Sequence, residues 1–301
     1  MFMLEQRPFI SIIIPHFNDS ERLACCLHAL ENQTYPTERY EIIVVDNGSD
    51  EPPLSVISQH PHSQLVVETK PGSYAARNKG LTMAKGEVIA FTDSDCLPQV
   101  DWLEKGENAL LHHDNIGVVA GQVNLFAADP NAPTVAEIYE QLSAFPIENF
   151  VKFWHFGVTA NLFTRRKLIE AVGEFNSTLK SGGDLEWGRR VYAAGYEIFY
   201  GADVIVNHPA LNNTKAIYSK KRRVHGGYHD LLVEQKKPYH YLWRDFPKDI
   251  LPPVRRSREF LSNSQFSLST RLQLVKIEWV CNYSVVFERL RLLCGGRSKR
   301  V

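Results

Sequence analysis

Three short apolar runs, rich in β-branched residues, constrain the fold of this chain more than any other feature. They are residues 9–14 (FISIII), 41–45 (EIIVV) and 87–92 (EVIAFT). Continuous apolar runs of this length are typical of strands that are buried on both faces. Helical patterns over 21–32 and 73–84 alternate with them. This alternation predicts an α/β fold with a mostly parallel, doubly wound sheet.

Polar residues follow the predicted strands at the points where the strands end. Right-handed crossovers bring the carboxyl ends of parallel strands to one edge, where such sheets bind ligands. The groups expected at this edge are residues 16–19, Asp46 with Asn47, Arg77 with Asn78, and Asp93 with Asp95. Asp and Asn are also common turn formers and helix caps, so each group alone has a purely structural interpretation.

The stretch FTDSDC places Asp93 and Asp95 two residues apart, directly after a predicted buried strand. Mg²⁺ and Mn²⁺ prefer oxygen ligands, typically one or two carboxylates together with phosphates of a substrate. The pair is therefore either a polar loop or a cation site that serves a diphosphate. The chain contains no G-x-x-x-x-G-K-[ST] motif, and no G-x-G-x-x-G follows the first strand. These absences argue against a P-loop protein and a dinucleotide enzyme.

A second acidic group lies in the stretch GGDLEW, where Asp184 follows two glycines at the start of a predicted helix. Glycines allow the backbone to approach a ligand closely, so Asp184 is a candidate general base. An acidic residue in the first turn of a helix is also favoured by the helix dipole. Asp184 is therefore either an N-cap or a base, and Glu186 lies two residues further on.

The order and spacing of these segments resemble the inverting family 2 glycosyltransferases, which have the A-type nucleotide-sugar fold. The resemblance covers about residues 8–210 and includes ISIIIPHFNDSERLACCLHALENQTYP, EIIVVDNGSDE, ARNKGLTMAKGEVIAFTDSDC, GVTANLFTRRKLIEAVGEFN, GGDLEWGRRVYAAGYEIFY and VIVNHPA. It implies an enzyme that moves a sugar from a UDP- or GDP-sugar to a hydroxyl of a sugar or lipid-linked acceptor. Polysaccharide or glycolipid assembly is the expected setting. The alternative is an inactive nucleotide-sugar-binding protein of the same fold.

The resemblance also implies roles for individual residues. Asp184 would be the catalytic base, and Asp95 with His208 would hold Mn²⁺ or Mg²⁺. The nucleotide pocket would be lined by Pro15, His16, Asn18, Asp46, Arg77 and Asp93, with Asp46 reading the base and Asp93 contacting the ribose. Further contacts to the acceptor or the diphosphate are expected from Asn161, Glu186 and Arg190.

The sequence departs from the family pattern in three respects. Gly183 stands where the family has the Glu of a Glu-Asp pair, and Asn47 replaces an Asp. The Q-x-x-R-W motif of processive members is absent, which argues against a polymerising synthase.

Charge separates the chain into two parts. Residues 1–210 hold 15 Lys and Arg against 27 Asp and Glu, whereas residues 211–301 hold 19 against 7. We therefore expect a catalytic domain over 1–210 and a basic, amphipathic helical extension over 211–301. Such asymmetry suggests an anionic partner: a membrane surface, a phosphate-bearing ligand or nucleic acid. Nucleic acid is disfavoured, because the extension lacks a recognised module with interleaved aromatic residues.

The extension contains two candidate contact segments. In YSKKRRVHGGYHD (218–230), four consecutive cations that end at Arg223 precede an expected Gly-Gly hinge. This segment is either a lid over the diphosphate or a solvated face. Residues 268–294 carry apolar side chains at helical spacing, which indicate core packing or an interfacial helix on an anionic membrane.

The remaining features concern the cellular compartment. Five cysteines without C-x-x-C spacing are typical of reduced thiols. Neither a secretion signal nor an apolar run of spanning length is evident. We therefore expect a cytoplasmic protein, placed at the inner face of the membrane if the extension binds lipid.

Overall fold

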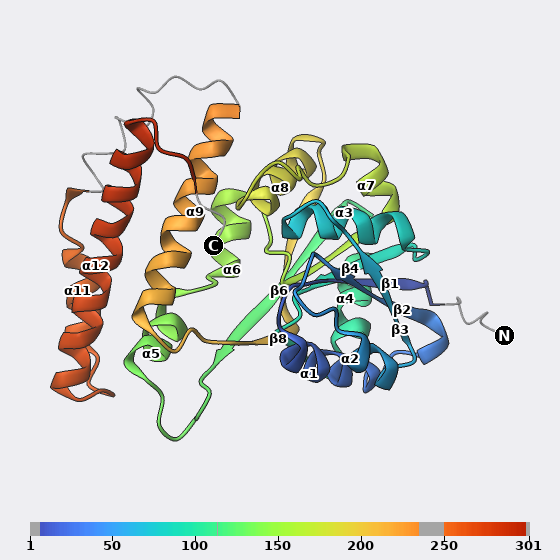
Figure 1. The fold of residues 1–301 in the computed structure, drawn as a ribbon, viewed down its shortest axis with the longest axis horizontal. Coiled ribbons are helices and arrows are strands. Elements are labelled where there is room, and N and C mark those ends of the chain that lie inside the picture. The colour runs from blue at the N-terminus through green and yellow to red at the C-terminus, as the bar shows by residue number, and fades with distance from the viewer. Residues whose placement is uncertain (1–6, 113, 235–249, 299–301) are drawn as a thin grey trace. The chain divides into compact units, whose positions relative to one another are not determined.

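The computed structural model describes residues 7–112, 114–234 and 250–298, and these form two compact units (Figure 1). Unit 1 comprises the chain up to Asn124 together with Phe145–Ser177 and Gly183–His208. Unit 2 comprises Leu125–Ala144, Thr178–Gly182 and the chain from Pro209 onward. Two short segments from the first 210 residues thus belong to unit 2. The boundary expected at residue 210 stays a prediction.

Unit 1 is organised around one sheet. Among the described residues, eight strands pair in the order β3-β2-β1-β4-β7-β6-β8-β5. In that order they span Ser63–Val67, Tyr40–Asp46, Ile10–His16, Val88–Thr92, Asn161–Arg165, Ile116–Phe126, Glu197–Pro209 and Leu97–Pro98. The strands β3, β2, β1 and β4 pair in parallel with one another, which confirms the strand–helix alternation predicted from the sequence.

The other half of the sheet is more mixed than the sequence predicts. Strand β7 runs antiparallel to both β4 and β6, and β5 runs antiparallel to β8. The two short strands expected over 196–200 and 203–206 are one continuous strand, β8. Strand β7 was not predicted, because NLFTR lacks both an apolar run and a strict alternation.

Helices cover both faces of the parallel half. On one face, α1 (Ser20–Glu31), α2 (Leu54–Gln59) and α4 (Trp102–Leu111) pack on the sheet, and on the other lies α3 (Ser73–Met83) (Figure 1). The alternation of a strand explains the division, since Ile10, Ile12 and Ile14 belong to the core with α1 and α4. Ile13 points the other way, against Gly80 of α3. A Cβ on Gly80 would lie 2.5 Å from the Ile13 side chain, so glycine allows close helix–sheet packing there.

Further short helices complete unit 1. They are η1 (Thr37–Arg39), α6 (Ile147–Asn149), η2 (Phe150–Trp154), α7 (Arg166–Val172) and α8 (Gly183–Ala193). Of these, α8 begins directly after the Gly-Gly pair and carries Asp184.

Unit 2 is helical. It contains α5 (Val135–Ser143), α9 (Thr214–Glu234), α11 (Val254–Ser262) and α12 (Leu268–Leu293), with α9 and α12 lying side by side (Figure 1). Helix α5 begins at a capping box, in which Thr134 and Glu137 each bond the other's backbone N–H. Its Tyr139 joins Ile217 of α9, Phe260 of α11 and Ile277 of α12 in one apolar core.

The basic segment 218–230 lies within α9. The expected Gly-Gly hinge is wrong, because the helix continues through Gly226 and Gly227 to Glu234. Two of the cations are held by buried acids: Lys220 binds Glu140 at 3.0 Å, and Arg222 binds Glu288 at 2.8 Å. The segment is therefore partly a packed face of unit 2.

Helix α12 divides its apolar residues between two faces. One face, with Leu274, Ile277 and Cys281, packs in the core of unit 2. Another carries Leu272, Trp279 and Phe287, which are 55%, 39% and 70% exposed. Within the described residues, the helices are too short or too polar to cross a membrane.

One buried polar residue ties the mixed part of the sheet together. Asn161 of β7 is fully buried and uses its whole amide. Its Nδ2 donates to the carbonyls of Gln122 and Val204 at 2.9 and 2.8 Å, and its Oδ1 accepts a 2.8 Å bond from Trp102 Nε1. Because β7 lies between β4 and β6, these bonds link the sheet to α4. Both polar atoms of the Asn161 side chain therefore make hydrogen bonds that hold the fold together.

We predict that Asn161→Ala destabilises the protein by about 2–4 kcal/mol, because it leaves buried donors and acceptors unsatisfied. Denaturant unfolding would measure the change, with the exposed Asn115→Ala as a control expected to stay within about 0.5 kcal/mol of the parent. Unaltered stability combined with a loss of sugar transfer would instead favour the acceptor contact that the sequence suggested.

Candidate active site

The ends of β1 and β2 bring His16 and Asp46 next to each other. The two residues are paired in the parallel register, and their side chains are 1% and 2% exposed. Both ring nitrogens of His16 are buried without a hydrogen-bond partner among the described residues. Desolvation lowers the pKa of His16, although the carboxylates of Asp46 and Asp19 oppose the shift. A neutral, unsatisfied imidazole at this edge is suited to a ligand that supplies a hydrogen bond.

The loops beside this pair are held by side-chain amides. Asn18 adopts the left-handed region, at φ 50°, and its amide group bonds both the carboxylate and the backbone N–H of Asp50. Asn47 donates to the carbonyls of Glu68 and Lys70 at 2.9 and 2.8 Å and accepts from Gly72 N at 2.6 Å. An ionised aspartate has no donor for the two carbonyls, so the structure explains why asparagine suits position 47.

Asp93 follows β4 and forms an ion pair with Arg77 of α3. The guanidinium is almost completely buried, and it lies over the Tyr74 ring, with Cζ 5.8 Å from the centroid. Asp93 remains about one-third exposed. The guanidinium of Arg77 thus balances the charge of Asp93, and the Asp93 carboxylate remains accessible to a ligand at the edge of the sheet.

Asp95 lies opposite His208, which the end of β8 delivers. Asp95 Oδ2 is 3.6 Å from His208 Nε2 and 3.8 Å from an Arg22 guanidinium nitrogen. Burial raises the pKa of Asp95, and the neighbouring Asp93 adds to this effect, while His208 and Arg22 oppose it. A cation bound beside Asp95 would stabilise the ionised form of its carboxyl group.

These two residues fit a divalent cation. Ligand atoms of Asp95, Cys96 and His208 lie within 4.8 Å of one another. The carboxylate is a suitable donor for Mn²⁺ or Mg²⁺, with phosphates completing the shell, and the imidazole nitrogen would be an additional ligand. Burial raises the pKa of Cys96 far above the usual range, which keeps this residue a thiol and a poor ligand.

Asp184 lies in the first turn of α8. Its Oδ1 accepts bonds from the Tyr74 hydroxyl at 3.2 Å and from Leu185 N at 3.0 Å. The carboxyl is only partly exposed, and desolvation raises its pKa against the opposing charge of Arg77. A raised pKa makes a carboxylate a stronger base.

The glycine before Asp184 has a structural reason. A Cβ on Gly183 would lie 2.7–2.9 Å from three ring atoms of Tyr74. Any side chain at position 183 would therefore displace the ring whose hydroxyl bonds Asp184. Position 183 carries a glycine because the tyrosine occupies the space.

The other predicted contact residues have structural partners. Glu186 and Arg190 bind each other at 2.8 Å within α8, and Arg190 also donates to the carbonyls of Val172 and Glu174. These bonds join α8 to the last residue of α7 and to the segment that follows it. Arg223 belongs to unit 2, so its proposed role as a lid stays a prediction.

Sequence reasoning missed two residues of this constellation, Tyr74 and Arg22. Tyr74 is one of several aromatic residues without a motif of its own, and its contact spans 110 positions. Arg22 lies on α1, three residues after Asp19, where an intrahelical ion pair explains it equally well. Only the folded structure brings both residues to the site, because their contacts join distant parts of the chain.

Comparison with known proteins identifies the family of the chain. The family described as "Glycosyl transferase family 2" matches residues 11–173. Glycosyltransferase AglE of Haloferax volcanii is 31% identical over 99% of this chain and 100% of its own length. A dolichyl N-acetyl-α-D-glucosaminyl phosphate 3-β-D-2,3-diacetamido-2,3-dideoxy-β-D-glucuronosyltransferase of Methanococcus voltae is 23% identical over 78% of this chain and 77% of that protein.

Among solved structures, the mannosyltransferase PcManGT from Pyrobaculum calidifontis, in complex with GDP-Man and Mn²⁺, has the same fold. The TM-score is 0.66 at 19% identity, over 96% of this chain and 88% of that one. The expected A-type fold is thus confirmed, and so is the resemblance stated from the sequence. The chain belongs to glycosyl transferase family 2 and is a glycosyltransferase that uses nucleotide sugars.

Proposed function

We propose that this glycosyltransferase inverts the anomeric configuration and acts on a sugar carried by a lipid phosphate. The observation that carries the proposal is the setting of Asp184. Its carboxyl is desolvated and faces a tyrosine, and both hydrogen bonds fall on the same oxygen. A direct displacement requires one base, which is what a single, oriented carboxylate supplies.

In this mechanism Asp184 takes the proton from an acceptor hydroxyl as that oxygen attacks the anomeric carbon. The bond from the anomeric carbon to the diphosphate oxygen breaks on the opposite side, which inverts the configuration. Tyr74 and the Leu185 amide hold the carboxylate during proton transfer. The donor nucleotide lies against His16 and Asp46, with its ribose near Asp93.

Asp95 and His208 would bind the divalent cation, Mn²⁺ or Mg²⁺. Such a cation would supply positive charge that offsets the charge developing on the departing diphosphate. Among the protein's own cations, Arg77 acts on this part of the site through Asp93, with which its buried guanidinium forms an ion pair. This ion pair holds the Asp93 side chain in place for the ribose.

The acceptor class is inferred from a relative and from unit 2. The Methanococcus voltae relative is named for a dolichyl-linked sugar phosphate as its acceptor. A lipid-linked acceptor lies in a membrane, and the exposed face of α12 offers Leu272, Trp279 and Phe287 beside the exposed cation Lys276. Apolar side chains flanked by cations are typical of helices that bind anionic membrane surfaces.

Asp184→Asn tests the base. We predict a fall in the transfer rate of about 100- to 10,000-fold, as expected for loss of a general base. The affinity for the nucleotide diphosphate should be nearly unchanged, because asparagine keeps the shape of the side chain. A radiolabelled-sugar transfer assay and nucleotide titration would measure the two quantities. An inactive nucleotide-sugar-binding protein would show binding and no transfer even in the parent chain, and transfer that survives the substitution would exclude Asp184 as the base.

Asp95→Asn tests the cation site. We predict that half-maximal activity requires about 10-fold more Mn²⁺ or greater, since even loss of a residue that only orients a metal ligand costs 10- to 100-fold in affinity. The titration would start from chelator-treated protein, and the exposed Asp203→Asn would serve as the matched control. Full activity of the chelated parent, without added metal, would contradict the assignment.

Membrane contact through α12 predicts that the parent protein floats with anionic vesicles. Replacing Leu272 and Phe287 by Ser should weaken partitioning by about 100-fold, because burial of two such side chains contributes roughly 3 kcal/mol. The matched control is Leu54→Ser, a 64% exposed leucine in unit 1. Equal flotation of both variants would show that the α12 face does not bind lipid.

A further inference from the structure

Within unit 2, one side of α9 gathers basic and imidazole side chains next to α12. Lys221, His225 and His229 follow one another at intervals of four residues, so they lie on the same side of the helix. Arg289 belongs to α12, and it lines one pocket together with the two histidines. Two neighbouring helices thus bring nitrogen-bearing side chains to a common space.

The pocket is small and partly open. Its remaining walls are Tyr228 and Leu292, and its volume is about 280 Å³ with the open mouth included. Pockets that hold drug-sized ligands are larger, at roughly 300–1,000 Å³. The innermost part has room for a group of about the size of one water molecule. The pocket therefore suits a small ion that enters by a single atom, and it is too small for a nucleotide.

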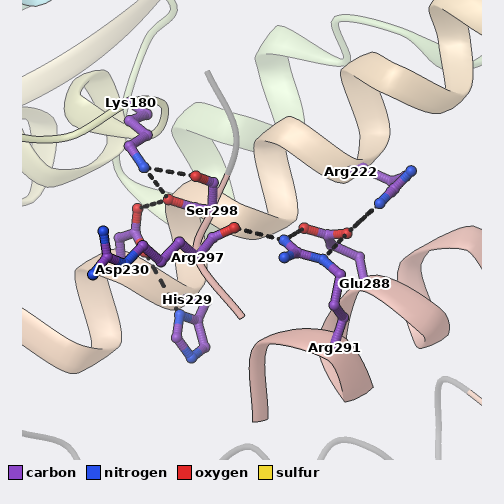
Figure 2. Close-up of polar contacts among 8 residues, drawn as sticks. All are labelled: Lys180, Arg222, His229, Asp230, Glu288, Arg291, Arg297 and Ser298. Carbon is purple, nitrogen blue, oxygen red and sulfur yellow. Dashed lines mark hydrogen bonds and ion pairs between the residues drawn. The ribbon is translucent and has the colours of Figure 1, made fainter. Parts of the chain in front are cut away.

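His229 has hydrogen-bonding capacity that its neighbours do not use. Both ring nitrogens are buried and lack a hydrogen-bond partner among the described residues. Asp230 Oδ1 lies 3.6 Å from His229 Nδ1, which is too far for a hydrogen bond, and the other Asp230 oxygen accepts a bond from the Ser298 hydroxyl (Figure 2). A buried polar group without a partner destabilises the folded state, so a ligand that bonds the ring would be stabilising.

The charges that act on the pocket are positive. Burial, followed by the charges of Arg289 and Lys221, lowers the pKa of His225 to about 4, so this ring is neutral at neutral pH. Glu288, the residue before Arg289, is already bound by two other arginines (Figure 2). Cations that are packed near one another oppose folding, and an anion between them would remove this cost.

A metal ion is a poor candidate for this pocket. Within the ranges that the structure describes, the metal-ligating side chains that gather in threes are Asp95, Cys96 and His208. Two histidines alone fall short of the four ligands of a structural zinc site. Arg289 and Lys221 would also repel a cation. An oxyanion suits both observations, because its oxygens accept bonds from N–H groups and its charge is opposite to that of the cations.

We propose that this pocket of unit 2 binds a phosphate group, with His229 and Arg289 as its hydrogen-bond donors. A guanidinium presents its donors in a fork that matches phosphate oxygens, and the imidazole gains the partner that it lacks. Bound phosphate would also join α9 to α12. Inorganic phosphate and the headgroup of an anionic phospholipid offer the same chemistry. The proposal does not depend on the function assigned to Asp184, since every residue that carries it belongs to unit 2.

The test compares Arg289→Gln with Arg258→Gln, which removes an exposed arginine from α11 of the same unit. The two variants have equal net charge, so a difference between them reports the position of the arginine. Inorganic phosphate would be titrated by calorimetry into chelator-treated, full-length protein. We expect binding to be about 10-fold weaker or more in Arg289→Gln, because hydrogen bonds between charged groups are strong, and to be unchanged in Arg258→Gln. Equal affinities in all three proteins would overturn the proposal.

NMR of the histidine rings locates the ligand in the parent chain, whether or not Arg289→Gln folds. Phosphate should shift the ring Cε1–H resonances of His225 and His229, which are assigned by replacing each residue with Gln. The resonance of the exposed His28 on α1 should not move. Shifts confined to His16 and His208 would place the phosphate at the active site and would refute the proposed pocket.

Vesicles separate the two sources of phosphate. The parent and both arginine variants would be floated with phosphatidylcholine vesicles that contain or lack phosphatidic acid. Weaker flotation of Arg289→Gln than of Arg258→Gln, only with phosphatidic acid, would assign the pocket to a lipid headgroup. Equal flotation of the two variants, combined with loss of phosphate binding in Arg289→Gln alone, would assign it to free phosphate. Absence of both effects would exclude a phosphate site in unit 2.

Discussion

The parallel pairing of β1 with both β2 and β4 is the constraint on which the site depends. Its register aligns His16 with Asp46, and Ile13 with Phe91, two residues before Asp93. Three strand ends therefore open at one edge, and buried side chains on both faces fix the pairing. A shift of one residue would turn every core isoleucine towards the wrong layer, so the core specifies the site as firmly as it specifies the fold.

Much of this arrangement could be predicted from the sequence, because the parallel half is built from local patterns. Apolar runs gave β1, β2 and β4, and the spacing of carboxylates after them indicated Asp46, Asp93 and Asp95. The antiparallel half could not be predicted in the same way. Strand β7 is held by the amide of Asn161 and by the Thr164 hydroxyl, which bonds the Gly117 carbonyl, and such contacts between distant residues leave no periodic signal. Helix α5 is different, because Thr134 and Glu137 stand at the spacing of a capping box in the sequence and this local signal marks the start of the helix.

Two of the three departures from the family pattern, Asn47 and Gly183, illustrate how a substitution can be explained by packing. Asn47 uses the donors that an aspartate lacks to join the loop after β2 to residues 68–72. Gly183 leaves the volume that the Tyr74 ring fills, and that ring then bonds Asp184. At both positions this chain lacks the carboxylate of the family pattern and has instead a contact that orders the site: the amide bonds of Asn47, and the Tyr74 ring packed on Gly183. A residue that departs from the family motif, such as Gly183, is thus packed against a residue outside the motif, Tyr74.

The basic composition of residues 211–301 acquires a more definite meaning from unit 2. Several cations are internal: Lys220 and Arg222 neutralise buried acids, and Arg291 of α12 binds Glu288 and the Arg297 carbonyl. These residues explain part of the charge without any external partner, because a buried carboxylate needs a paired cation. The cations that remain at the surface, such as Arg255 and Lys276, attract anions over a distance of only about 8–10 Å at physiological salt. Charge alone would therefore give a weak, salt-sensitive contact with lipid. The exposed apolar residues of α12 would make the same contact persist at higher salt, since burial of Phe287 does not depend on screening.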